Sequence, residues 1–344
     1  MIIGTILKES LTRNASDVLL SSWALPWLKV HGDVAYLEEY EVYTDEVLRE
    51  ELYSIMTKSQ KETFLKELEL DFSIELKGFS RFRVNCFVQK NGISGVFRPI
   101  PTDIPKFEDL RVPAQVKDFA HKRGGLVLVT GTVWSGKSTT LASLINEINL
   151  TECRHIITVE DPIEYTYKSW KSLIEQREVG EDTHNFSNWL KYALRQAPDV
   201  ILVWEMRDLE TFRLALRAAE TGSLVFATLH TSGAARTVAR IIDMFPGDEK
   251  EIVRQQVSDS LLWVVWQALL KKKDGTWRVP AIEVMVNNKW ISNLIRKWLT
   301  HQINSSIETW RSDGMVPMKD SLDELLKSDM ITQKDYDYYI DLEE

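Results

Sequence analysis

Apolar runs of strand length alternate with helical patterns from about residue 114 onward. The runs lie in GLVLVTG, HIITVEDP, DVILVWE and LVFATLH, and segments such as NWLKYALRQA and LETFRLALRAAETG, with apolar residues at helical spacing, separate them. Nearly continuous apolar strands that alternate with helices are typical of a parallel sheet covered on both faces. The pattern therefore predicts an α/β domain over residues 114–344. We expect this domain to be largely helical beyond residue 233.

The first hundred residues show a different pattern. Helical spacing in TILKESLTR and DEVLREELYSIM, a strand in DVLLSS and a turn at HGDV precede a stretch of period-two alternation. An Asn91-Gly92 pair in that stretch predicts a hairpin. We expect a small α+β domain over residues 1–100. Three prolines in PTDIPKFEDLRVP then predict a linker over residues 101–113.

Composition narrows the class of protein. With 44% apolar and 27% charged residues, the chain of 344 residues is typical of a soluble globular protein. No apolar run is long enough to span a bilayer, and MIIGTILKESLTR lacks the apolar core and cleavage site of a signal peptide, so we expect a cytoplasmic location. Two cysteines, Cys86 and Cys153, exclude a four-cysteine zinc site. A net charge of −9 disfavours a nucleic-acid partner.

One loop carries a strong chemical signal. GTVWSGKSTT, residues 131–140, fits the phosphate-binding pattern G-x-x-x-x-G-K-[ST] between a predicted strand and a predicted helix. In such loops main-chain N–H groups surround the phosphates, the lysine reaches their oxygens and the final hydroxyl ligates Mg²⁺. Glu205, at the end of DVILVWE, suits the acidic partner of that Mg²⁺. The expected nucleotide-binding residues are Gly131, Ser135, Gly136, Lys137, Ser138 and Thr139, with Ser138 and Glu205 as metal ligands.

Three further stretches resemble one protein family. HIITVEDPIEY is similar to the Asp box, APDVILVWEMRD to the Walker B region and TGSLVFATLHTSGAARTVARIIDMFP to the His box of the secretion ATPases that drive type IV pili and type II secretion. The likeness runs from ASDVLL to SLDELL and is greatest to the pilus-retraction (PilT) type. The resemblance implies a RecA-like P-loop NTPase core behind a PAS-like N-terminal domain. It also implies a homo-hexameric ring that binds ATP and Mg²⁺ between the domains.

The resemblance also assigns roles to residues. It implies that Glu164 is the general base and that Glu160 and Asp161 shape the same pocket, whereas a carboxylate on a loop is otherwise usually only solvated. It makes His230 a sensor of the γ-phosphate, with a structural histidine as the alternative, and Ser223 stands where the family commonly has a second histidine. Arginines would supply the positive charge that stabilises the transferred phosphoryl group, namely Arg81, Arg83, Arg98 and Arg207. The first three could instead be solvated residues of a strand, and Arg207 could serve a subunit interface.

The function that the resemblance implies is pilus retraction, hence twitching motility. Hydrolysis would pull on an inner-membrane platform protein at the inner face of the membrane, beside a paralogous motor ATPase. Retraction is favoured over pilus extension or secretion because no four-cysteine insertion is present and ISNLIR, residues 291–296, resembles a retraction element. That stretch is also compatible with an ordinary amphipathic helix. A third possibility is a ring scaffold that does not hydrolyse ATP.

The scaffold possibility arises from tryptophans at unexpected positions. Trp134 and Trp204 stand where the family has glycine in the phosphate loop and before the Walker B acid. The chain has 12 Trp and 15 Gly, together about 8% of residues, close to the usual share of glycine alone. We hypothesise that the gene uses UGA for glycine, as some bacterial lineages do. The alternative is genuine tryptophans, with Trp263 and Trp266 sharing a buried helix face, and Trp27 is the residue that best suits it. Turn-like positions hold Trp277, Trp298 and Trp310, and small residues would also fit at Trp23, Trp170, Trp189, Trp263, Trp266 and Trp290.

Overall fold

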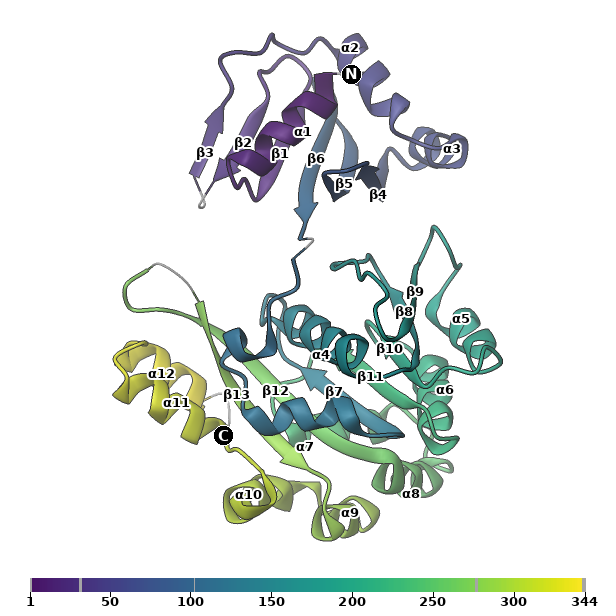
Figure 1. Ribbon diagram of the computed structural model, residues 1–344, viewed down its shortest axis with the longest axis vertical. Coiled ribbons are helices and arrows are strands. Elements are labelled where there is room, and N and C mark those ends of the chain that lie inside the picture. Colours follow the sequence, from purple (N-terminus) through teal and green to yellow (C-terminus); the bar gives the residue numbers. More distant parts are fainter. Residues whose placement is uncertain (1, 31–32, 102, 276–277, 342–344) are drawn as a thin grey trace. The chain divides into compact units, whose positions relative to one another are not determined.

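The computed structural model describes residues 2–30, 33–101, 103–275 and 278–341 (Figure 1). Its contacts divide the chain into two compact units. The first comprises Met1–Asp103 together with Glu164–Thr166, and the second comprises Ile104–Ile163 and Tyr167–Glu344. Each unit has a hydrophobic core of its own.

The first unit is an antiparallel sheet with three helices. Its strand order is β3-β2-β1-β6-β5-β4, and every neighbouring pair is antiparallel. Helices contact the strands, and buried residues such as Leu48 and Phe64 join them to the core. The elements are α1 (Ile2–Thr12), β1 (Asp17–Ser21), β2 (Trp27–Val30), β3 (Asp33–Tyr36), α2 (Asp45–Ser54), α3 (Lys58–Glu67), β4 (Glu69–Leu76), β5 (Ser80–Gln89) and β6 (Gly92–Ile100).

The predicted hairpin is confirmed as β5 and β6, with Gln89 paired to Gly92 across the turn. Alternation along β5 buries Phe82, Val84 and Cys86 and leaves the residues between them on the opposite face of the sheet. The small α+β unit expected at the N-terminus is therefore present. The turn expected at HGDV falls on residues 31–32, which lie outside the described residues.

The second unit is a seven-stranded sheet in the order β13-β12-β7-β11-β10-β8-β9. Every neighbouring pair is parallel except the edge pair of β12 and β13. Its strands are β7 (Gly125–Thr130), β8 (His155–Glu160), β9 (Leu173–Glu178), β10 (Val200–Val203), β11 (Leu224–Leu229), β12 (Leu261–Lys271) and β13 (Arg278–Val286). Its α-helices are α4 (Lys137–Thr151), α5 (Phe186–Ala193), α6 (Leu209–Glu220), α7 (Ala234–Asp243), α8 (Lys250–Ser260), α9 (Lys289–Arg296), α10 (Ile303–Thr309), α11 (Met318–Lys327) and α12 (Gln333–Asp341), and its 3-10 helices are η1 (Phe107–Leu110), η2 (Ala114–His121), η3 (Thr300–Gln302) and η4 (Arg311–Asp313).

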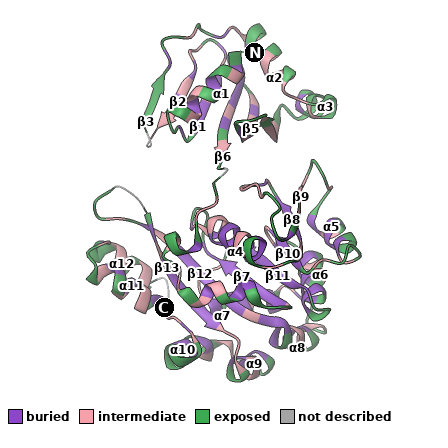
Figure 2. Ribbon diagram, viewed as in Figure 1, coloured by how far each residue is buried: buried purple, intermediate pink, exposed green. Residues whose placement is uncertain are grey.

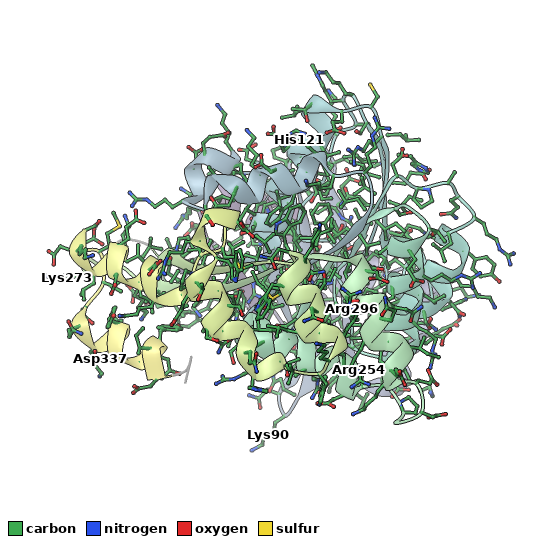
Figure 3. The ribbon with its side chains drawn as sticks, turned by 90° about the horizontal axis from the view of Figure 1, so that it is seen from below. Lys90, His121, Arg254, Lys273, Arg296 and Asp337 are labelled. Atoms are coloured by element: carbon green, nitrogen blue, oxygen red, sulfur yellow. The ribbon has the colours of Figure 1, made fainter. Side chains whose placement is uncertain are left out.

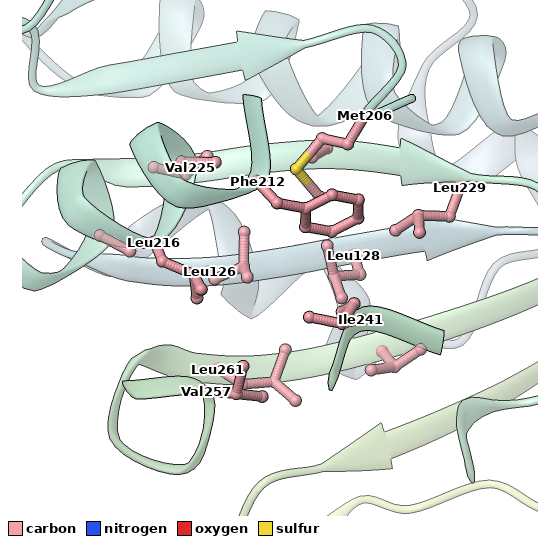
Figure 4. Packing of buried hydrophobic residues seen from close by; sticks show 14 of the residues in the cluster. Leu126, Leu128, Met206, Phe212, Leu216, Val225, Leu229, Ile241, Val257 and Leu261 are labelled. Carbon is pink, nitrogen blue, oxygen red and sulfur yellow. The ribbon is translucent and has the colours of Figure 1, made fainter. Parts of the chain in front are cut away.

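Helices cover both faces of this sheet, as the continuous apolar strands predict. Leu126 and Leu128 of β7 face Phe212 of α6 and Ile241 of α7 (Figure 4). The alternate residues of β7 face the other side, where α4 and η2 lie. The central strands are therefore buried throughout, whereas the outer surfaces of the helices are exposed (Figure 2). The RecA-like α/β core is confirmed.

Charged side chains surround this unit, for example Arg296 on α9 and Asp337 on α12 (Figure 3). Within the described ranges no helix combines the length and the apolar character that crossing a bilayer requires.

The expectation of a largely helical region beyond residue 233 is wrong for residues 261–271 and 278–286. These two segments are the strands β12 and β13, and the sequence did not reveal them because an apolar run that is buried on both faces has no periodicity to distinguish strand from helix. Trp263 and Trp266 consequently lie on opposite faces of β12 and do not share a helix face. Trp263 stacks on Phe119, with ring centroids 4.0 Å apart, and Trp266 packs against Met318 of α11. Strand β9 was also not expected from the sequence.

The segment expected to be a linker lies mostly inside the second unit. The division between the units falls after Asp103, three residues beyond the expected end of the N-terminal domain. Phe107 is 5% exposed and belongs to the cluster on the α4 face of the sheet. Ser143 of α4 also donates a hydrogen bond to the carbonyl of Pro105, 2.8 Å away. These contacts attach residues 104–113 to the second unit.

Replacing Phe107 with alanine tests this attachment. Loss of a buried phenylalanine leaves a cavity, so Phe107→Ala should lower the free energy of unfolding of the second unit by about 3–5 kcal/mol in urea titrations. Tyr192 of α5, which is 56% exposed and lies in the same unit, provides the control, and Tyr192→Ala should change that free energy by less than about 1 kcal/mol. Equal effects of the two substitutions would show that residues 104–113 are a free linker.

Candidate nucleotide-binding and hydrolysis site

The phosphate loop connects the end of β7 to the start of α4. Gly131 (φ 146°) and Gly136 (φ 86°) bracket it in conformations that side chains rarely adopt. A Cβ at Gly131 would lie only 2.2 Å from the carbonyl oxygen of Gln267 on β12. The loop can therefore run close against β12 because glycine stands there. Main-chain N–H groups at the start of α4 make this end of the helix a natural anion site.

Two side chains in the loop suit a phosphate group. The Lys137 ammonium donates hydrogen bonds to the carbonyl oxygens of Gly131 and Thr132, both 2.8 Å away, and only 7% of the residue is exposed. The Ser135 hydroxyl is buried and has no hydrogen-bond partner among the described residues. Buried hydroxyl groups are normally paired, so an oxygen-rich ligand would complete this site. Ser138 and Thr139 lie half-buried in the first turn of α4.

Parallel pairing brings the Walker B acid to the phosphate loop. Glu205 follows β10 and His230 follows β11, and both strands run parallel to β7. The His230 Nε2 atom lies 3.2 Å from a carboxylate oxygen of Glu205. The Nδ1 atom of the same ring lies 3.3 Å from the carbonyl oxygen of Gly131. His230 therefore connects the expected catalytic carboxylate to the phosphate loop.

Arg207 supplies positive charge beside this carboxylate. Its guanidinium lies 2.5 Å from Glu205 and 4.0 Å from Asp161, which follows β8. The hydrogen bond to Glu205 raises the pKa of Arg207 above its usual value, so the guanidinium stays charged. Both carboxylates and the arginine thus gather at the carboxyl edge of the sheet, where ligands bind in open α/β folds.

Side chains of the neighbouring strand β9 fix the Asp-box loop that follows β8. Glu160 is buried and accepts hydrogen bonds from the Thr158 hydroxyl (2.8 Å) and the Gln176 amide (3.0 Å). Glu178 accepts a hydrogen bond from the backbone N–H of Ile163. These contacts fix the chain immediately before Glu164, which itself belongs to the first unit.

Known proteins share this arrangement of motifs. Residues 103–316 match the family model described as "Type II/IV secretion system protein". The chain belongs to this family. It is 46% identical over 329 residues to the "Twitching motility protein" of Neisseria gonorrhoeae, which covers 96% of this chain and 88% of the relative. It is 45% identical to the "Type IV pilus retractation ATPase PilT" of Pseudomonas aeruginosa, over 97% of this chain and 96% of the relative.

A solved structure agrees over both units. The "Crystal Structure of the Pilus Retraction Motor PilT and Bound ADP" superposes with a TM-score of 0.92 at 42% identity and covers 98% of this chain and 96% of that one. The likeness to retraction ATPases inferred from the motifs is therefore confirmed. Within the type II/IV secretion family, the chain is an ATPase of the pilus-retraction type.

The three N-terminal arginines named from the family's motifs lie on one face of the first unit. Arg83 of β5 and Arg98 of β6 are register partners, and Arg81 follows at the next position on that face of β5. Each has a local partner: Arg98 forms an ion pair with Asp17 (2.8 Å), Arg83 lies 3.9 Å from Asp71, and Arg81 donates a hydrogen bond to Ser73 (2.6 Å). The sheet therefore presents them together, on the face opposite the core.

Several residues of the site carried no signal in the sequence. Gln176 and Glu178, which hold the Asp-box loop, lie on β9, a strand that the hydrophobic pattern did not predict. Gln267 lies within an apolar run, and its closeness to the phosphate loop is evident only from the structure. Ser223 stands where the family commonly has a second histidine. Its hydroxyl donates a hydrogen bond to the carbonyl of Pro198.

The two tryptophans near the site differ from each other. Trp134 adopts a left-handed backbone (φ 67°) and is 67% exposed, so its indole gains little from burial. Trp204 has no positive φ and packs, half-buried, against both main hydrophobic clusters. The backbone therefore favours glycine at position 134 and places no such demand on position 204.

Removing the charge of Glu205 tests the assembled site. Glu205→Gln preserves the shape of the side chain but removes the carboxylate, so kcat for ATP hydrolysis should fall about 10²-fold in a phosphate-release assay. ADP affinity, measured by calorimetry, should change little. Glu210→Gln, in the first turn of α6, is the control and should leave kcat unchanged. A Glu205→Gln protein with normal turnover would remove Glu205 from the mechanism.

Proposed function

We propose that the protein is a motor that hydrolyses ATP to retract type IV pili. The observation that carries this proposal is the link from the phosphate loop through His230 to Glu205, in a chain that matches a retraction ATPase over nearly its full length. These contacts place the phosphate-binding element and the acidic group beside the same imidazole ring. Phosphoryl transfer requires both elements. It also requires positively charged groups close to the transferred phosphoryl group.

The loop residues bind and orient the nucleotide in this proposal. Main-chain N–H groups of residues 132–138 and the Ser135 hydroxyl donate hydrogen bonds to phosphate oxygens. The Lys137 ammonium exchanges its bonds to the Gly131 and Thr132 carbonyls for bonds to the phosphates. This exchange couples nucleotide binding to the conformation of the loop.

A magnesium ion suits the same residues. The Ser138 hydroxyl and the Glu205 carboxylate are hard oxygen donors, and the described residues contain no group of three or more His, Cys, Asp or Glu that could hold a metal. Mg²⁺ commonly takes only one or two protein ligands and completes its shell with water and substrate phosphates. When bound, the ion would neutralise charge that develops on the phosphate oxygens.

Glu164 is the proposed general base. Two residues shortly before it are fixed by hydrogen bonds. Glu160 accepts from Thr158 and from Gln176 of β9, and the N–H of Ile163 donates to Glu178 of β9. A carboxylate held in this way can orient a water molecule and accept its proton. The arginines Arg81, Arg83 and Arg98 would supply charge from the first unit when a neighbouring subunit or a domain movement brings them to the phosphates.

Assembly and partners complete the proposal. A homo-hexameric ring would bind ATP and lie at the inner face of the cytoplasmic membrane. Hydrolysis would rotate the units relative to one another and pull on an inner-membrane platform protein, beside a paralogous motor ATPase. The stretch 291–296 lies in α9, where Ile291, Leu294 and Ile295 are buried. Its outward residues remain available for such contacts.

Substituting Glu164 distinguishes the base from a bystander. Glu164→Gln should lower kcat about 10²-fold, because a neutral amide cannot accept the proton of water, and leave ADP affinity unchanged. Glu62→Gln, on the exposed side of α3, is the control. Phosphate-release kinetics at saturating ATP provide the measurement, and an unchanged kcat for Glu164→Gln would reject the assignment.

A chromosomal Lys137→Ala variant tests the direction of the motor. Loss of the ammonium should abolish ATP binding, so retraction stops while extension continues, and the cells should carry more surface pili and no longer twitch. Electron microscopy and a twitching assay are the measurements, with Lys66→Ala as the control because Lys66 is an exposed residue. Cells without pili would instead identify an extension motor, and unchanged cells would favour the scaffold.

A further inference from the structure

Gln267 is a polar residue in the middle of a buried strand. It lies in the run LLWVVWQALL of β12 and is only 3% exposed. Burial of an amide side chain is unfavourable unless its polar atoms find hydrogen-bond partners. The surroundings of Gln267 therefore indicate why an apolar residue does not occupy this position.

The contacts of Gln267 reach both ends of the phosphate loop. Its main-chain carbonyl oxygen would lie 2.2 Å from a Cβ at Gly131. Its side-chain Nε2 atom would lie 2.7 Å from a Cβ at Gly136. Its Oε1 atom accepts a hydrogen bond of 2.8 Å from the buried hydroxyl of Thr140, one turn into α4. One residue thus contacts the start of the loop, the end of the loop and the helix that the loop begins.

We propose that Gln267 is a positioning residue that holds the phosphate loop in its nucleotide-binding conformation. β12 pairs with β7 up to Trp266 and Thr130, so Gln267 is the next residue beside the point where β7 becomes the loop. Its side-chain amide lies beside Gly136 and attaches α4 to the sheet through Thr140, while its main-chain carbonyl lies beside Gly131. This role rests on the proposed nucleotide site and adds to it a residue outside the phosphate-loop motif.

Two substitutions separate the functions of the amide. Gln267→Met keeps the approximate length of the side chain and removes both polar atoms. Gln267→Glu keeps an oxygen that can accept from Thr140 and places a negative charge beside Gly136, close to the bound phosphates. We expect the Kd for ADP to rise about tenfold in Gln267→Met, and by more in Gln267→Glu because like charges repel. Gln256→Met and Gln256→Glu, on α8, are the matched controls and should bind ADP normally.

A double-mutant cycle with Thr140 tests the mechanism. Thr140→Ser keeps the hydroxyl and should bind ADP normally, whereas Thr140→Val should weaken binding. Because both residues share one hydrogen bond, Thr140→Val should add little to the effect of Gln267→Met. Additive effects, or a normal Kd for ADP in Gln267→Glu, would overturn the proposal. If Gln267 were purely structural, its substitution would lower the thermal midpoint and leave the Kd of the folded protein unchanged. Wild-type protein that does not bind ADP would instead refute the proposed function.

The backbone at three tryptophans carries a second, independent inference. Eight described residues other than glycine have a positive φ, and three of them are Trp23 (φ 64°), Trp134 (φ 67°) and Trp298 (φ 59°). Tryptophan contributes only 12 of 344 residues, so this share is far above its frequency. A left-handed backbone crowds the Cβ of an L residue against the next carbonyl, and glycine is the residue that adopts it without this cost.

The local hydrogen bonds at Trp298 and Trp23 specify glycine positions. At the end of α9, the N–H of Trp298 bonds to Ile295 and that of Leu299 to Leu294, a Schellman motif whose left-handed residue is usually glycine. At Trp23, the N–H of Ala24 bonds to Ser21, so Trp23 is the third residue of a turn with positive φ there, where glycine is again preferred. Trp23 is also 60% exposed.

We infer that the cell makes this protein with glycine at positions 23, 134 and 298, through codons that the printed translation renders as tryptophan. The inference does not extend to Trp27, which lies in β2 without a positive φ and whose ring contacts Tyr36 edge-on at 5.2 Å. Trp263, which stacks on Phe119, likewise has no positive φ. Trp277 lies outside the described residues, and Trp310 has a negative φ of −99°.

Mass spectrometry of the protein from its own cells tests this inference directly. Peptides that span positions 23, 134 and 298 should have the mass of glycine, and tryptophan at all three would overturn the inference. In recombinant protein of the printed sequence, Trp23→Gly and Trp298→Gly should each raise the thermal midpoint, whereas Trp27→Gly, the control, should lower it. Lower midpoints for the first two variants would contradict the backbone argument. Trp134→Gly should bind ADP more tightly than the printed sequence.

Discussion

The parallel pairing of β7, β11, β10 and β8 is the constraint on which the site depends. Parallel strands end at the same edge, so the segments that follow them come together even though they are far apart in the sequence. The phosphate loop, His230, Glu205 and Asp161 each follow one of these strands. Glycine at positions 131 and 136 then lets the main chain approach β12 and turn into α4. The chemistry of the site is therefore a consequence of strand order and two small residues.

Polar contacts convert this proximity into a defined geometry. Lys137 on two loop carbonyls, His230 between Gly131 and Glu205, and Gln267 against both loop glycines all lie at the same edge of the sheet. Lys137 and Gln267 are buried, where an unpaired polar group would be costly, so their contacts favour one arrangement of the loop. In the proposed function nucleotide binding replaces the loop contacts of Lys137, whereas the contacts of Gln267 can remain.

The sequence predicted the parts of this molecule that depend on local pattern. Continuous apolar runs predicted β7, β8, β10 and β11, and the motif in the loop predicted α4 and the position of Lys137. The same reasoning failed for β12, because a strand buried on both faces has no alternation and resembles a buried helix. It missed β9, an edge strand rich in charged residues, and with it Glu178. The contacts of Gln267 could not be predicted, because the register of β12 against β7 is a long-range property.

In the proposed function, bare main chain between Gly131 and Ser138 holds the phosphates of a nucleotide beside Glu205. A crystal structure of the protein from its own cells, grown with ADP and Mg²⁺, tests this arrangement. We expect phosphate oxygens within hydrogen-bonding distance of the N–H groups of residues 132–138, with the Lys137 ammonium moved from the loop carbonyls to the phosphates. A nucleotide bound elsewhere, or Lys137 still on Gly131 and Thr132 with ADP in place, would contradict it.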